Sequence, residues 1–285
     1  MTNPHLAGAL PPASEILADV DRAFAEDIGP GDATADLLDA NASATAVLTC
    51  REAAVLCGTA WFDAAFRKLD PNVQIEWLAA DGDRIAAGSA LCRIAGKARA
   101  LVTAERSALN FLQLLSATAT VTSHYADAIA DTKTRVLDTR KTIPGLRRAQ
   151  KYAVLCGGGT NHRIGLFDAM MLKENHIIAA GGIPAAVRAA RAIHPSLPLI
   201  VEVETLDELA QVIEAGGDRA LLDNFTPEML KEAVAFTAGR MPLEVSGNVE
   251  IDTIRAIADT GVDFISSGAL TKHIRAIDLS LRLNL

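Results

Sequence analysis

Six short apolar runs in the second half of this 285-residue chain each end in polar or charged residues. The residues at those ends, in chain order, are Asp138-Thr139-Arg140-Lys141, Lys173, Glu202 with Glu204, Asp223-Asn224, Glu244 with Ser246, and Ser267. A single charge of this kind fits a structural ion pair as well as a functional group. Polar residues at the ends of all six runs favour a functional site, because carboxylates and cations that lie close together have the perturbed pKa values that catalysis and binding use.

Basic residues cluster in one stretch of an otherwise acidic chain. The net charge is −8, yet residues 135–176 hold eight Lys/Arg and three Asp/Glu, so this segment is +5 and the rest is −13. The overall charge argues against binding to nucleic acid or to an anionic membrane. The local excess of cations predicts a small anionic ligand, with a solvated basic face as the competing interpretation.

Glycine-bearing turns follow the last two apolar runs. Ser246-Gly247-Asn248 and Ser267-Gly268-Ala269 each precede a predicted helix, whose free N–H groups and positive dipole end can bind phosphate. Either turn alone fits an ordinary glycine turn, whereas the pair favours a phosphorylated ligand. A glycine run at 157–159 precedes His162 and Arg163, and it fits either a segment that wraps a substrate or a plain loop.

The elements that must position these residues change character along the chain. In the first part, periodicity predicts helices at 14–27, 61–69 and 103–129 (the last as one helix or two) and strands within 44–58 and 73–102. In the second part, predicted strands at 136–138, 169–173, 199–204, 220–223, 243–246 and 264–267 accompany predicted helices at 184–194, 206–215, 227–237 and 249–259. This alternation favours an α/β barrel, and a strand count below eight predicts that the barrel is incomplete or irregular.

Several protein classes lack support in the sequence. There is no P-loop, no dinucleotide-binding glycine fingerprint and no GxSxG elbow, and the histidines lack zinc-site spacing. No run of 18 apolar residues predicts a membrane span, and the first ten residues do not resemble a secretory signal. The cysteines Cys50, Cys57, Cys92 and Cys156 show no paired framework, so they are predicted to be small core residues. We therefore expect a cytoplasmic protein.

The motifs, in their order and spacing, resemble the quinolinate phosphoribosyltransferase family (carboxylating nicotinate-nucleotide pyrophosphorylases) from about residue 15 to the end. The matching segments are 26–32, 103–106, 138–145, 157–163, 172–176, 202–205, 222–224, 245–248 and 264–270. No single motif is decisive, but their succession is highly specific. Two positions depart from the family pattern: Asn248 stands where many members have glycine, and Thr271-Lys272-His273 replaces a more familiar Thr-His-Ser.

The resemblance implies a two-domain α/β enzyme with the type II phosphoribosyltransferase fold. An N-terminal α/β sandwich domain would comprise residues 1–115, joined by the C-terminal tail at 275–285. An open, TIM-like α/β barrel would comprise residues 116–274 and hold the catalytic site. Members of the family form head-to-tail homodimers, so Arg106 of the partner subunit would reach into that site.

The resemblance also implies a reaction of NAD biosynthesis. The enzyme would transfer phosphoribosyl from phosphoribosyl pyrophosphate (PRPP) to quinolinate, giving nicotinate mononucleotide, pyrophosphate and carbon dioxide. The implied catalytic residues are Lys141, Lys173, Glu202 and Asp223. The implied substrate-binding residues are Arg106, Thr139, Arg140, Lys141, His162, Arg163, Lys173, Glu202, Asp223, Ser246, Gly247, Asn248, Ser267, Gly268 and Ala269. Magnesium would arrive with PRPP near Glu202 and Asp223, without a dedicated metal site, and no organic cofactor is expected.

Three other functions stay open at this point. A sister phosphoribosyltransferase acting on another pyridine-like acid, without decarboxylation, would need fewer cations. A Schiff-base aldolase would use Lys173 together with the same phosphate-binding turns. A non-catalytic sensor would bind an anionic metabolite without turnover.

Overall fold

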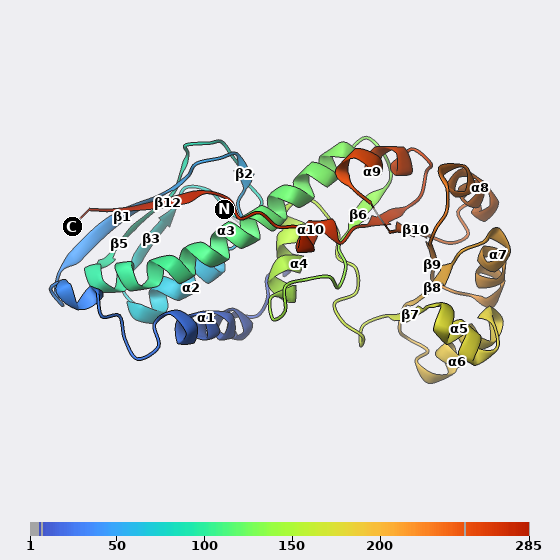
Figure 1. Ribbon diagram of the computed structural model, residues 1–285, viewed down its shortest axis with the longest axis horizontal. Coiled ribbons are helices and arrows are strands. Elements are labelled where there is room, and N and C mark those ends of the chain that lie inside the picture. Colours follow the sequence, from blue (N-terminus) through green and yellow to red (C-terminus); the bar gives the residue numbers. More distant parts are fainter. Residues whose placement is uncertain (1–5, 7, 248, 285) are drawn as a thin grey trace. The chain divides into compact units, whose positions relative to one another are not determined.

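The computed structural model describes residue 6 and residues 8–247 and 249–284, which divide into two compact units (Figure 1). The first unit takes in Met1–Ser123, Ile143–Gly158 and His273–Leu285, and the second takes in His124–Thr142 and Gly159–Lys272. The expected α/β class is confirmed. In the described ranges, no helix combines the length and the apolar character needed to cross a membrane.

The first unit is built on a four-stranded antiparallel sheet in the order β12-β1-β5-β3. Its strands are β1 Ser43–Cys50, β3 Gln74–Trp77, β5 Ala90–Lys97 and β12 Leu279–Asn284. A separate pair joins β2 Ala54–Val55 to β4 Arg84–Ile85. Alternate residues of β1 are buried, which is the period-two pattern of a sheet with one face on the core.

Helices supply the rest of the core of the first unit. They are α1 Ala13–Asp27, α2 Thr59–Leu69, α3 Ala98–Ala128 and α4 Arg147–Cys156, with a short 3₁₀ turn at Ala35–Leu37. In α1, the buried Ile16, Val20 and Phe24 recur every fourth residue and form a single apolar stripe. The helices predicted at 14–27 and 61–69 are therefore confirmed, whereas α4 was not predicted.

The long helix α3, green in Figure 1, corrects one expectation and settles another. It begins at Ala98, so the preceding strand ends at Lys97 and does not reach residue 102, and it runs unbroken as one helix. No Gly or Pro lies between residues 98 and 128 to interrupt it. Its threonines do not break it either, because Thr118, Thr120 and Thr122 each donate their hydroxyl to the carbonyl four residues earlier.

All four cysteines are buried thiols, as predicted for small core residues. Burial raises the pKa of Cys57 well above its ordinary value, and the neighbouring Cys156 thiol raises it further. The buried Asp81 carboxylate nearby accepts hydrogen bonds from two backbone N–H groups and from the Tyr152 hydroxyl at 3.0 Å. The Asp81 carboxylate thus has hydrogen-bond partners within the first unit, and we interpret this polar cluster as part of its core.

The second unit is a six-stranded parallel sheet in the order β6-β11-β10-β9-β8-β7. Its strands are β6 Arg135–Leu137, β7 Met170–Leu172, β8 Leu199–Val203, β9 Arg219–Leu222, β10 Leu243–Ser246 and β11 Phe264–Ser266. Its helices are α5 Glu174–Ala180, α6 Ile183–Ile193, α7 Leu206–Ala215, α8 Pro227–Thr237, α9 Ile251–Ala258 and α10 Ala269–Lys272. The order begins at β6 and ends at β7, so the barrel is open, and all six predicted strands are present.

Local signals in the sequence explain why strands and helices alternate so regularly here. The strands are short apolar runs; in β8, for example, four of the five residues are buried. Thr205 and Thr226 cap α7 and α8 by accepting hydrogen bonds from Glu208 and Met229 N–H groups. Gly216 ends α7 at φ 84°, in the left-handed region that glycine enters without strain. Each strand is therefore followed by a short helix, which returns the chain to the start of the next parallel strand.

An ion pair at the amino ends of β8 and β9 gives a stability prediction. Asp218 accepts from Arg191 Nη2 at 2.8 Å and from the Leu199 N–H at 2.7 Å. Partial burial alone would raise the pKa of Asp218, but these hydrogen bonds and the charge of Arg191 bring it below its ordinary value of 3.8. The stabilisation is therefore complete above that value and is lost as pH falls through the lower folded-state pKa.

Asp218→Asn should lower the free energy of unfolding by about 0.5–1 kcal/mol at pH 7, because the pair is half exposed and screened. The difference from wild type should be smaller at pH 3 than at pH 7, because the loss begins as pH falls below 3.8. Urea unfolding at both pH values measures it. An equal difference at the two pH values would contradict the assignment.

Candidate active site

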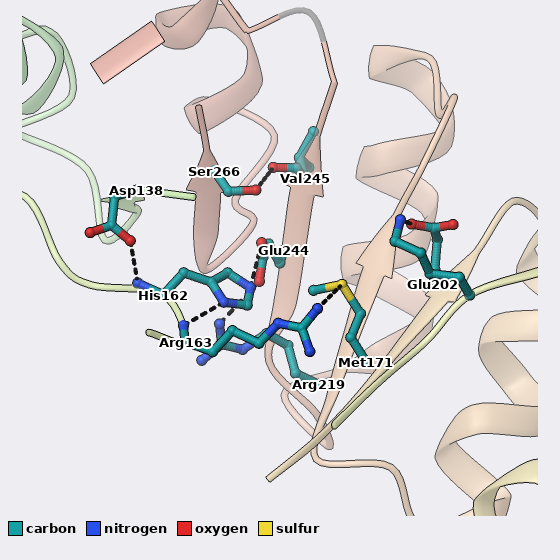
Figure 2. A network of polar contacts seen from close by, with 10 residues as sticks. Asp138, His162, Arg163, Met171, Glu202, Arg219, Glu244, Val245 and Ser266 are labelled. Carbon is teal, nitrogen blue, oxygen red and sulfur yellow. Dashed lines mark hydrogen bonds and ion pairs between the residues drawn. The ribbon is translucent and has the colours of Figure 1, made fainter. Parts of the chain in front are cut away.

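The strands of the second unit bring their polar ends to one edge and their inward side chains to one face. Parallel partners on neighbouring strands point to the same side, and the register pairs Met171 with Ile200, Ile200 with Arg219, Glu202 with Leu221, Leu221 with Glu244, and Glu244 with Phe264. The charged residues of β8, β9 and β10 therefore share the face that Figure 2 views. The carboxyl-terminal edge of this face is where barrel enzymes hold their substrates.

Lys173 and Glu202 form an ion pair at this edge. Lys173 directly follows β7, and its ammonium group donates to Glu202 Oε2. The lysine side chain is half exposed, whereas that of Glu202 is only 16% exposed. The Lys173 N–H donates to His176 Nδ1 at 3.0 Å, which ties the start of α5 to the strand end. The pair presents a cation and a carboxylate to solvent at the barrel edge.

Lys141 lies against the turn that follows β11. A Cβ built on Gly268 would stand 2.9 Å from Lys141 Cδ and 3.6 Å from Thr139 Oγ1, so this close approach favours glycine. The Lys141 N–H donates to Thr139 Oγ1 at 3.1 Å, and its carbonyl accepts from Thr271 Oγ1 at 2.8 Å. Segments about 130 residues apart in the chain are thus joined around one lysine.

The two glycine turns are held by different contacts. The buried Ser267 hydroxyl donates to the Val249 carbonyl at 2.9 Å and accepts from the Ala269 N–H at 3.2 Å. Gly247, which follows Ser246 at the end of β10, has φ 96°, and a Cβ there would lie 3.5 Å from Asp223 Oδ1. Asp223 thus faces the first turn as Lys141 faces the second. Asn248 lies outside the residues that the structure describes.

Arg140 and Arg163 place two cations near each other. Burial lowers the pKa of Arg163, the positive charge of Arg140 lowers it further, and Asp168 opposes both effects. Arg163 Nη1 donates to the Ala169 carbonyl at 3.0 Å and Nη2 contacts Met171 Sδ at 3.8 Å. An anion between two guanidinium groups relieves their repulsion, and the planar fork of arginine suits a carboxylate or phosphate.

A buried polar network connects Arg163 to the strands (Figure 2). Glu244 is 1% exposed, with Oε2 3.0 Å from Arg219 Nη1 and Oε1 3.3 Å from His162 Nε2. The His162 N–H donates to Asp138 Oδ1 at 2.8 Å. Among these residues, sequence reasoning singled out His162 for binding and Asp138 and Glu244 as strand-end groups, but it missed Arg219. Arg219 could have been found only from the strand register, which pairs Leu221 of β9 with Glu244 of β10.

Arg106 belongs to the first unit, where it is an exposed residue of α3. Within the described residues, one cluster has three His, Cys, Asp or Glu ligand atoms within 4.8 Å of one another, and it is the Cys57, Asp81 and Cys156 group of the first unit. At the barrel edge, Glu202 and Asp223 are the carboxylates on neighbouring strand ends, and both are partly exposed.

Models of two protein-family domains match the chain along most of its length. The N-terminal domain of quinolinate phosphoribosyl transferase matches residues 32–116, and the C-terminal domain matches residues 118–282. The chain belongs to the quinolinate phosphoribosyltransferase family. The expectation drawn from the ordered motifs is thereby confirmed.

Named relatives of the family agree in sequence over nearly the whole chain. A chloroplastic carboxylating nicotinate-nucleotide pyrophosphorylase of Oryza sativa is 40% identical over 294 residues, covering 96% of this chain and 79% of that protein. A probable carboxylating nicotinate-nucleotide pyrophosphorylase of Bacillus subtilis is 38% identical over 263 residues, covering 92% and 91%.

Solved structures agree in fold. The nicotinate-nucleotide pyrophosphorylase from Francisella tularensis superposes with a TM-score of 0.94 at 49% identity, covering 96% of this chain and 98% of that one. Human nicotinic acid phosphoribosyltransferase shares the fold alone, with a TM-score of 0.61 at 15% identity. The open barrel of the second unit is thus the barrel of a type II phosphoribosyltransferase.

The paired guanidinium groups predict preferential binding of a dianion. Benzene-1,2-dicarboxylate should raise the melting temperature of the wild type more than benzoate does. In Arg163→Ala the dicarboxylate should bind at least ~10-fold more weakly, because a charge-assisted hydrogen bond contributes about 1.5–3 kcal/mol. Arg255→Ala, which removes an exposed guanidinium paired with Asp131 and Asp259, is the control. Equal thermal shifts in the two variants would contradict the assignment.

Proposed function

We propose that this protein transfers the phosphoribosyl group of PRPP to quinolinate and releases carbon dioxide, giving nicotinate mononucleotide and pyrophosphate. The observation that carries the proposal is a cluster of cations: Arg140 acts electrostatically on Arg163, and Lys141 packs against the turn at Gly268. Quinolinate brings two adjacent carboxylates and PRPP brings a phosphate and a pyrophosphate. A family member with this concentration of cations and phosphate-type turns suits both substrates.

The quinolinate carboxylates would lie against Arg140, Arg163 and Lys173, with His162 next to Arg163. Lys173 is kept in place by Glu202, and Arg163 by the Ala169 carbonyl and Met171. These contacts leave the cations anchored on strand ends, so little side-chain freedom has to be lost on binding. Binding both carboxylates at once fixes the orientation of the pyridine ring.

PRPP would bind along the glycine turns. The 5′-phosphate would meet the turn formed by Ser267, Gly268 and Ala269 and the one formed by Ser246 and Gly247, with Lys141 and Thr139 at its side. Asp223 and Glu202 would hold the ribose hydroxyls and orient the magnesium ion that PRPP brings. Magnesium prefers carboxylate oxygens and keeps several waters, so two partly exposed carboxylates suit it better than a closed cage.

The reaction then needs positioning and charge more than a further reactive group. The pyridine nitrogen attacks the anomeric carbon of the ribose, and the bond to pyrophosphate breaks with both electrons going to the leaving oxygen. The 2-carboxylate then leaves as carbon dioxide, its bonding electron pair stays on the ring carbon as a carbanion that the adjacent positively charged nitrogen stabilises, and a proton adds to that carbon. Carboxylates near the ribose favour the positive charge that develops there.

The aldolase alternative fits the site poorly. A Schiff-base lysine is uncharged and lies in an apolar pocket or beside another cation. Lys173 is half exposed and ion-paired with Glu202.

Turnover tests the proposal directly. Incubation with quinolinate, PRPP and magnesium should release nicotinate mononucleotide and carbon dioxide in equal amounts, and omission of any one component should abolish both products. Product from nicotinate without carbon dioxide, and none from quinolinate, would instead establish the sister activity.

The proposal includes a homodimer with shared sites, in which Arg106 of the partner subunit completes the quinolinate pocket. Arg106→Ala and Lys173→Ala should each be nearly inactive alone. After subunit exchange between the two variants, roughly a quarter of wild-type activity should return, since half of the dimers then hold one intact site of two. Exchange without recovery would rule out the cross-subunit role.

We also propose that this protein is located in the cytoplasm, in contrast to some plant relatives. Relatives from plants carry names that place them in chloroplasts or mitochondria.

A further inference from the structure

Three ionisable side chains, those of Glu244, Arg219 and His162, meet inside the barrel, and the central one, Glu244, is shielded from solvent. The Glu244 side chain is 1% exposed, and it lies between the Arg219 guanidinium and the His162 ring. Arg219 is itself covered by the Phe264 ring, whose centroid is 4.3 Å from Cζ. Burial would raise the pKa of Glu244, but its contacts with His162, Ser266 and Arg219 outweigh that effect and lower it. Glu244 is therefore a carboxylate that depends on its two neighbours.

The hydrogen bonds of His162 determine where its proton lies. Nδ1 accepts from the Arg163 N–H at 2.6 Å, and a nitrogen that accepts a hydrogen bond carries no proton. The ring is then neutral, with its proton on Nε2, 3.3 Å from Glu244 Oε1. Glu244 Oε2 pairs with Arg219, whereas its Oε1 contacts His162 Nε2 outside hydrogen-bonding geometry.

The same ring holds the backbone that carries Arg163. The two consecutive N–H groups of His162 and Arg163 are held by Asp138 and by the imidazole. Asp138 is fully buried, so this part of the chain is anchored to the end of β6. The Arg163 side chain is held as well, because its guanidinium group contacts the Ala169 carbonyl and Met171 Sδ.

We propose that Glu244 and Arg219 are positioning residues for quinolinate binding, which act through a neutral His162 to hold Arg163 beside Arg140. The His162 ring then contributes by orienting Arg163 and not as a cation on the substrate. This inference rests on the proposed function. Neighbours that orient a binding group commonly change affinity ~10–100-fold when they are replaced.

Two substitutions of His162 separate the roles of its nitrogens. In His162→Asn the amide oxygen takes the place of Nδ1 and can accept from the Arg163 N–H, whereas in His162→Gln the amide reaches the place of Nε2. We expect His162→Asn to show the smaller rise in KM for quinolinate and His162→Gln a rise of ~10-fold or more. The opposite ranking would mean that Nε2 or a cationic ring binds substrate, and would overturn the inference.

Replacement of Glu244 tests the buried pair. Glu244→Gln keeps the volume but leaves the Arg219 charge without its carboxylate, so KM for quinolinate should rise ~10-fold while KM for PRPP changes less than about twofold. Glu244→Gln combined with Arg219→Gln removes the uncompensated cation and should recover part of that loss. Asp218→Asn, which removes a carboxylate from an ion pair at the amino end of β9, is the matched control and should leave both KM values unchanged.

A purely structural role predicts a different pattern. Loss of folded protein would lower kcat in proportion to the active fraction and leave both KM values unchanged, and the double variant would be worse than the single one. That pattern would overturn the inference. Circular dichroism and melting temperature, measured for every variant, report the folded fraction independently.

The protonation state of His162 gives a readout that does not depend on substrate. In ¹⁵N-labelled protein, the signals that disappear in His162→Asn should be those of a ring protonated at Nε2 and not at Nδ1 at pH 7. A cationic ring, or a proton on Nδ1, would overturn the inference even in a fully active enzyme. Failure of the wild type to turn over quinolinate, with the neutral ring observed, would count against the proposed function instead.

Discussion

The repulsion between Arg140 and Arg163 is the constraint on which the account of this site depends. Burial lowers the pKa of Arg163, and the positive charge of Arg140 lowers it further, so the charge of Arg163 costs energy in the unliganded site. An anion with two negative groups removes that cost, so the binding energy is concentrated where two carboxylates can reach both arginines. The Ala169 carbonyl and Met171 Sδ contact the Arg163 guanidinium group and fix its position.

The barrel positions the polar side chains of the site mainly on strands and on the segments that directly follow them. Parallel strands in register put Glu202, Arg219 and Glu244 on one face, and the residues that follow the strands lie together at one edge. The glycine turns then let backbone N–H groups and Lys141 approach a common ligand without a Cβ in the way. Glu202, Arg219 and Glu244 lie on strands, whereas Lys141, Lys173 and the glycine turns lie in the segments that follow strands.

The sequence predicted the second unit well because its signals are local. Each strand is a short apolar run with a polar end, and caps such as Thr205 and Thr226 mark where helices begin. The first unit was harder. The strand β5 ends at Lys97 and the helix α3 begins at Ala98, with no Gly or Pro between them, so the predicted strand ran too far. The sequence also did not decide between one helix and two for α3.

The buried network could not be predicted for a different reason. Arg219 and Glu244 are 25 residues apart, and they meet because Leu221 of β9 pairs with Glu244 of β10. Register is a property of the folded sheet, and a charge at a strand's start reads in sequence as an ordinary surface residue. Sequence order and spacing gave the family and the edge of the site, while the support beneath that edge needed coordinates.

Calorimetric titration with quinolinate and with nicotinate, each without PRPP, tests the central claim most directly. Both ligands carry the pyridine ring, and they differ by the one carboxylate that the second guanidinium group would bind. The account predicts that quinolinate binds at least ~10-fold more tightly, since one charge-assisted hydrogen bond contributes about 1.5–3 kcal/mol. Equal affinities for the two acids would contradict it.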